Sequence, residues 1–131
     1  RQRMRAWAKT QAAKDAGVES RLLGPREWFS ELARYKFLLA PMGSGIQTAQ
    51  PIDSLLVLTV PIVQRMAFTT YDELAGMGFP IIVVDGWAEV TRKKTGQWWR
   101  MLSPRLESFR RNCLSVEGYW RMYVGQVKFC T

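Results

Sequence analysis

The sequence predicts an α/β fold with a small, mostly parallel sheet of three or four strands, flanked by helices and followed by a helical C-terminus. Short apolar runs alternate with segments of helical periodicity, the order expected of strand–helix–strand crossovers. The run PIIVVD at residues 80–85 is apolar almost throughout, which is typical of a strand buried on both faces of a parallel sheet. Such crossovers are right-handed.

The first third of the chain is predicted to be mainly helical. Alanine-rich residues 3–16 favour one helix, ended by Gly17. Residues 19–23 are a weak strand candidate. Pro25 suits a first helical position, and apolar side chains then recur at helical spacing as far as Tyr35.

The middle of the chain carries the predicted sheet. Strands are expected at residues 36–40, 60–64 and 80–85, with helices at 51–58 and from Thr69 or Thr70 to Met77. Gly76 and Gly78 are expected to end the second of these helices, and a brief turn is expected at residues 86–88.

The last part of the chain is predicted to hold three helices, over residues 95–102, 104–112 and 115–124, with Ser115 as an amino-terminal cap. Two stripes at helical spacing are expected to pack these helices against the sheet, although aromatic clusters can also stack on sugars. The stripes are Trp98, Trp99, Leu102, Leu106 and Phe109, and Val116, Tyr119, Trp120 and Tyr123.

A length of 131 residues fits one domain, spanning residues 1–131. The small number of strands leads us to expect a fragment of a longer protein, in which residues 92–124 are closing helices and 125–131 a tail. No apolar run is long enough to span a bilayer.

The formal charge of +8 is unevenly distributed. Net charge is +5 over residues 1–36, −4 over 37–91 and +7 over 92–131. A pI near 10 raises nucleic-acid binding as an alternative. The basic runs are short and interleave with apolar positions, so we expect solvated helix faces and no nucleic-acid partner. Binding to an anionic polysaccharide or to an acidic lipid surface is a further function that this charge could serve.

The chain contains no histidine, which excludes Ser-His-Asp catalysis and histidine metal ligands from these residues. Two cysteines, Cys113 and Cys130, are too few for a zinc site of their own. The sequence leaves open whether they pair, as in an oxidising lumen, or are buried thiols. We take free thiols as the expectation.

Residues 37–63 carry the main functional signal. The apolar run 37–40 stops at Pro41, and a glycine-containing loop follows, after which an amphipathic segment contains the lone carboxylate Asp53. Glycines at such a turn allow close approach of a phosphate, and Asp53 can accept hydrogen bonds from a sugar hydroxyl pair. The alternative interpretation is a tight structural turn with Asp53 solvated.

Residues 28–91 and 103–120 together resemble the donor-binding domain of exostosin-like glycosyltransferases. The resemblance implies a Rossmann-like half of a GT-B fold that binds a nucleotide-sugar, expected to be UDP-linked, with no separate cofactor and no metal. By position, the implied nucleotide-sugar-binding residues are Gly43, Ser44, Gly45, Gln47, Thr48 and Asp53, with Arg65 a further candidate near the phosphates.

The same resemblance implies that a missing N-terminal domain holds a glycan acceptor. It also implies a type II membrane protein of the Golgi or endoplasmic reticulum lumen, attached to the membrane through an upstream anchor. The catalytic base stays unassigned, because no carboxylate here fits the role and the partner domain can supply one.

The chain departs from the family pattern at the presumed phosphate site. Met42 stands where an arginine is usual, and Ala49 and Gln50 replace a His-Arg pair. Losing two cations removes charge-assisted hydrogen bonds of about 1.5–3 kcal/mol each. A non-catalytic scaffold or carbohydrate-interaction domain is therefore the alternative function.

Four further acidic residues lie in the middle of the chain: Asp72, Glu73, Asp85 and Glu89. Asp85 ends a strand at the ligand-binding edge and is expected to cap the turn at Trp87. Glu89 is expected to be exposed. Residues 71–73 could reach the donor sugar, although Asp72 and Glu73 also suit the first turn of a helix.

Overall fold

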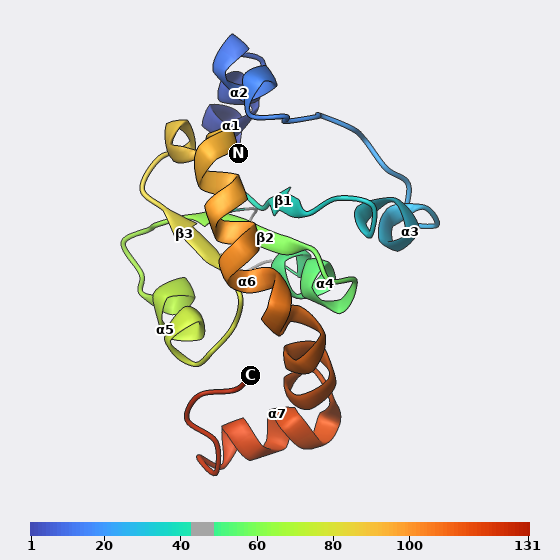
Figure 1. Cartoon of the computed structure of the whole chain (residues 1–131), viewed down its shortest axis with the longest axis vertical. Coiled ribbons are helices and arrows are strands. Elements are labelled where there is room, and N and C mark those ends of the chain that lie inside the picture. The colour runs from blue at the N-terminus through green and yellow to red at the C-terminus, as the bar shows by residue number, and fades with distance from the viewer. Residues whose placement is uncertain (43–48) are drawn as a thin grey trace.

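The computed structural model describes residues 1–42 and 49–131, and it confirms the predicted α/β class. Strands β1 (Phe37–Leu39), β2 (Val60–Gln64) and β3 (Ile82–Val84) form a parallel sheet in the order β1-β2-β3 (Figure 1). In its register Leu39 pairs with Ile62, and Ile62 with Ile82. The possible fourth strand at residues 19–23 is wrong, because that segment is irregular.

Two short helices make the crossovers between these strands. Helix α4 (Gln50–Leu56) leads into β2, and α5 (Thr70–Gly76) joins β2 to β3. The buried Thr59 ties the start of β2 to the residues around α3 (Trp28–Leu32), because its hydroxyl lies 2.9 Å from the carbonyl oxygens of both Leu32 and Tyr35. Helix α3 is shorter than predicted but lies where its apolar stripe placed it.

The amino-terminal helix is interrupted. Instead of one helix over residues 3–16, the structure has α1 (Gln2–Ala8) and α2 (Gln11–Asp15). The break is at Thr10, whose hydroxyl donates to the Trp7 carbonyl at 2.7 Å and accepts from the Ala13 amide at 3.3 Å. Threonine thus caps a new helix at this position, a role that competes with continuing the old one.

Helix α6 (Arg92–Cys113) runs unbroken through Pro104, so the two helices predicted there are wrong. The missing proline amide costs a hydrogen bond, but one buried stripe continues on both sides of it and outweighs that cost. The stripe consists of Leu102, Leu106, Phe109 and Cys113. A single-turn helix, η1 (Trp87–Glu89), stands at the predicted turn before α6.

The hydrophobic core lies between the sheet and α6, which crosses the strands in Figure 1. Trp99 of α6 meets Phe37 of β1 edge-on with ring centroids 5.8 Å apart. Phe109 meets Phe79 in the same manner at 4.9 Å. The expected packing of the first aromatic stripe is therefore confirmed.

The second stripe does not pack on the sheet. Helix α7 (Val116–Tyr123) begins at Ser115, whose hydroxyl caps the Gly118 amide as predicted. Of its residues, only Gly118 and Met122 are buried. The four residues expected to face the core are all exposed: Val116, Tyr119, Trp120 and Tyr123.

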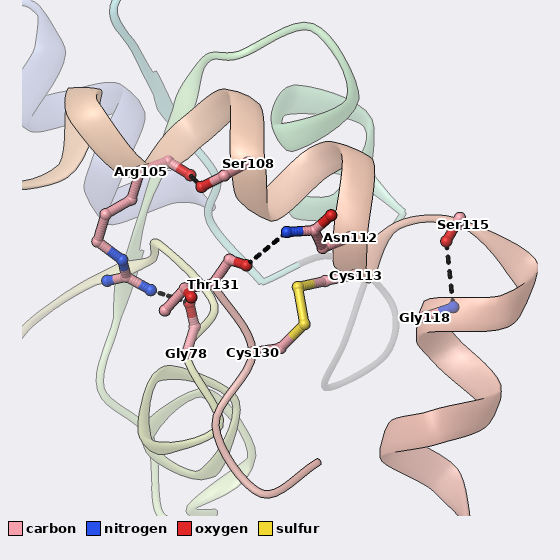
Figure 2. The surroundings of a disulfide bond; sticks show 9 residues. All are labelled: Gly78, Arg105, Ser108, Asn112, Cys113, Ser115, Gly118, Cys130 and Thr131. Atoms are coloured by element: carbon pink, nitrogen blue, oxygen red, sulfur yellow. Dashed lines mark hydrogen bonds between the residues drawn. A yellow bond between two sulfur atoms is a disulfide. The ribbon is translucent and has the colours of Figure 1, made fainter. Parts of the chain in front are cut away.

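Cys113 and Cys130 form a disulfide, so the expectation of free thiols is wrong (Figure 2). The bond joins the last turn of α6 to the C-terminal segment. The Cys130 amide also donates to the Met77 carbonyl at 2.8 Å, and the Asn112 side chain donates to the Thr131 carbonyl at 3.0 Å. Residues 125–131 are thus anchored to α6 and to the turn before β3. Among the described helices, none combines the length and apolar character needed to cross a membrane.

Candidate functional site

The carboxyl ends of the three parallel strands meet at one edge of the sheet, where such sheets bind ligands. β2 is followed there by Arg65 and β3 by Asp85, and the Arg65 amide donates to the Val84 carbonyl at 2.7 Å. The loop that follows β1 contains five predicted ligand residues, which lie outside the described residues and stay predictions: Gly43, Ser44, Gly45, Gln47 and Thr48.

Arg65 lies between two carboxylates. Its Nε donates to Asp85 Oδ1 at 2.8 Å, and its Nη1 pairs with Asp72 from the first turn of α5. These hydrogen bonds, the one to Asp85 first, raise the pKa of the Arg65 guanidinium above its usual value. A phosphate at this edge must compete with both carboxylates. The competition is mild, because all three side chains contact solvent and exposed ion pairs are worth little.

Asp53, the predicted ribose ligand, lies in the first turn of α4 and is half-buried. Its Oδ2 accepts a hydrogen bond from Trp28 Nε1 of α3 at 3.2 Å. A carboxylate can accept about four hydrogen bonds, so acceptor positions remain for a pair of sugar hydroxyls. Trp28 orients the carboxylate and is a positioning residue that the sequence pattern did not reveal. The contact joins two separate helices, so it left no local signal.

The turn after β3 is capped by Glu89, and the expectation that Asp85 caps it is wrong. Glu89 Oε2 accepts hydrogen bonds from the backbone amides of Asp85 and Gly86, at 2.5 and 3.0 Å. Lys94 Nζ lies 3.5 Å from the other carboxylate oxygen. Glu89 is consequently half-buried, although it was expected to be exposed. The Asp85 side chain pairs with Arg65, while the Asp85 amide donates to Glu89. The cap and the ion pair therefore meet at Asp85.

This cap predicts an acid-sensitive contribution to stability. The backbone amide of Gly86, followed by that of Asp85 and the charge of Lys94, lowers the pKa of Glu89 below its ordinary value, against the opposing effect of burial. A lowered folded-state pKa stabilises the protein fully above the unfolded pKa, and the benefit is lost as pH falls through the folded pKa.

We therefore expect Glu89→Gln to lower the unfolding temperature near neutral pH and to change it little well below about pH 4. Thermal unfolding followed by circular dichroism at both pH values measures this. The exposed Glu107 of α6, which pairs with Arg110 of the same helix, is the matched control. An equal loss for Glu89→Gln at both pH values would contradict the assignment of the cap.

The residues before and within α5 behave as a helix start. The Thr69 hydroxyl donates to Glu73 Oε1 at 2.6 Å, and Asp72 and Glu73 both lie in the first turn, as expected from the helix dipole. Tyr71 is buried in the core. Asp72, which could reach the donor sugar, pairs with Arg65.

Two hollows are found elsewhere, at the junction of α6 and α7, with volumes of about 330 and 140 Å³. The larger is lined in part by Cys130. The Cys130 amide donates to the Met77 carbonyl, in the turn that leads to the amino end of β3. Both hollows therefore belong to a different part of the molecule from the carboxyl edge. Within residues 1–42 and 49–131, no group of three acidic or cysteine side chains is arranged to hold a metal.

No protein-family model, no curated protein and no solved structure matches this chain.

Proposed function

We propose that this chain is the donor-binding half of a GT-B glycosyltransferase of the exostosin-like kind. It holds a UDP-linked sugar at the carboxyl edge of its parallel sheet, with the diphosphate against the loop of residues 43–48 and the ribose against Asp53. A glycan acceptor and the catalytic base come from an N-terminal domain of the full-length protein. Alone, the chain has no transferase activity.

The observation that carries the proposal is the unit β1–loop–α4–β2, with an oriented carboxylate in the first turn of α4. The Trp28 indole fixes one carboxylate oxygen of Asp53 and leaves the other for a ligand. Because Asp53 is half-buried, a hydrogen bond from a sugar hydroxyl is less weakened by water than at an exposed site. The parallel sheet supports the same interpretation, because such sheets usually bind ligands outside the carboxyl ends of their strands.

In this proposal the chain binds and orients the donor. The leaving diphosphate gains negative charge as the anomeric bond breaks, so a cation near it favours the transition state. Arg65 is the cation that the described edge offers, after exchange of a carboxylate for a phosphate. The Cys113–Cys130 disulfide supports an oxidising compartment, which agrees with the proposed luminal location of the Golgi or endoplasmic reticulum.

Asp53→Ala tests the ribose assignment. We expect it to weaken binding of UDP or a UDP-sugar by about ten- to hundredfold, since a charge-assisted hydrogen bond is lost. Trp28→Phe keeps an aromatic ring but removes the donated hydrogen bond, and we expect a smaller loss. Isothermal titration calorimetry measures both.

Asp15→Asn is the matched control, because this exposed residue ends α2, far along the chain from α4. Its side chain accepts from Gln11, and its carbonyl accepts from Arg92. The substitution should leave the affinity unchanged. Unaltered affinity in Asp53→Ala, with normal unfolding, would contradict the ribose site.

The second candidate is a non-catalytic scaffold or carbohydrate-interaction domain. It is favoured by the double pairing of Arg65 together with Met42, which stands where the family has an arginine. A thermal-shift comparison with UDP separates the two functions. The donor domain is stabilised by the nucleotide, whereas the scaffold is not.

A further inference from the structure

Helix α7 turns its apolar side away from the molecule. Gly118 and Met122 mark the buried side, and five apolar residues occupy the solvent side, with exposed fractions from 42% to 91%. We call them the α7 stripe: Val116, Tyr119, Trp120, Tyr123 and Val124. A surface helix normally directs its apolar side toward the core, so the orientation of α7 is inverted.

The packing of Gly118 fixes this orientation. A β-carbon on Gly118 would come within 1.9 Å of the Asn112 carbonyl oxygen and 2.9 Å of the Cys113 α-carbon. The helix can therefore approach the end of α6 only through this glycine. Ser115 caps the same turn through the Gly118 amide at 3.1 Å (Figure 2). The exposure of the stripe thus follows from a close backbone contact.

The rings of the stripe pack against one another. Tyr119 and Tyr123 lie with centroids 6.5 Å apart and an interplanar angle of 18°, and Trp120 and Tyr123 at 5.9 Å and 30°. All three rings remain well exposed, by 59% to 74%. Tyrosine and tryptophan, with apolar bodies and polar tips, are residues enriched at the headgroup level of a bilayer.

Positive charge lies beside the stripe. Arg121 of α7 and Arg111 of α6 line the polar hollow of about 140 Å³ at the base of α7. Residues 110–131 contain four basic residues and one acidic residue, Glu117. Glu117 pairs with Arg121 in an exposed ion pair, which is easily exchanged for another anion. The flank of the stripe is therefore complementary to phosphate groups.

We propose that α7 binds an anionic phospholipid surface, with the α7 stripe at the headgroup level and with Arg111 and Arg121 on lipid phosphates. Helix α7 lies at one end of the molecule, opposite α1 and α2, where a flat surface can reach it (Figure 1). An eight-residue helix is about 12 Å long. A membrane surface, unlike a protein partner, needs no matching contour.

Vesicle sedimentation tests the proposal, which does not depend on the proposed transferase function. The chain should sediment with vesicles of phosphatidylcholine and phosphatidylglycerol, and much less with phosphatidylcholine alone. Binding should fall between about 0.1 and 1 M salt, as the screening length shortens from about 10 to 3 Å. Trp120→Ser with Tyr123→Ser should lower the partition coefficient by about tenfold or more.

Phe68→Ser is the matched control, since Phe68 is an aromatic residue of similar exposure, 56%, outside α7. It should leave partitioning unchanged. Arg111→Gln with Arg121→Gln should remove most of the salt dependence. Failure to sediment with anionic vesicles would overturn the proposal. So would an equal loss in Phe68→Ser, or a stripe variant that keeps full vesicle binding but loses self-association in ultracentrifugation.

Discussion

We expect replacement of Cys113 and Cys130 by alanine to lower the free energy of unfolding by about 3 kcal/mol, the loop-closure value for a 17-residue separation. The disulfide joins α6 to the tail, and its loss releases chain entropy in the unfolded state. For a chain of this length the change corresponds to a fall of roughly 10–15 °C in the unfolding temperature. Calorimetry of the oxidised protein and the double variant measures it.

Reduction of the unaltered protein provides the matched comparison, since it breaks the same bond without substituting a residue. It should reproduce most of the loss. We also expect faster amide exchange at Cys130, whose amide bonds to the Met77 carbonyl. A double variant as stable as the oxidised protein would contradict a stabilising role for this bond.

Gly78→Ala is expected to destabilise the protein by about 3 kcal/mol, through backbone strain and overpacking together. Gly78 has a φ of +99°, which L-residues rarely adopt. A β-carbon there would lie 2.1 Å from the Cys130 carbonyl oxygen and 2.8 Å from its amide nitrogen. These are backbone atoms held by the disulfide, so they yield little. Urea unfolding gives the difference.

Gly76→Ala is the control for this substitution. Gly76 lies in the last turn of α5, and a β-carbon there would meet nothing within 4 Å. We expect a neutral effect or a gain of about 0.5–1 kcal/mol, because alanine favours helix. Since Gly78 and Cys130 touch, Gly78→Ala and Cys130→Ala should be non-additive. Strict additivity would contradict the close contact between the turn and the tail.

The prediction of the sheet was accurate because its signals are local. A short apolar run between turn residues predicts strand β2 at its observed limits, and the continuous run after Pro80 predicts β3. The helix boundaries were less accurate. Pro104 and Thr10 were misjudged in opposite directions, since a buried stripe outweighs a missing amide at the first and a capping hydroxyl interrupts a favourable sequence at the second.

In the candidate site, too, local features were predicted and long-range contacts were not. The sequence indicated Arg65 and Asp85 at the carboxyl edge, because strand ends are local features, and it placed Asp53 in the helix before β2. It did not reveal that Trp28 holds Asp53, nor that Glu89 rather than Asp85 caps the turn. Those contacts depend on how separate segments pack, and residue type alone does not specify a partner.

By itself the sequence determined the α/β class, the parallel strands and the unequal distribution of charge, since periodicity and composition report directly on burial and solvation. Only the tertiary structure decided that the cysteines pair and that the aromatic side of α7 faces outward. The disulfide lies beside the close contact of Gly78 with the Cys130 backbone. The orientation of α7 goes with the close contact of Gly118 with the Asn112 backbone. Hydrophobic periodicity gives a helix an apolar side, but packing determines which way that side faces.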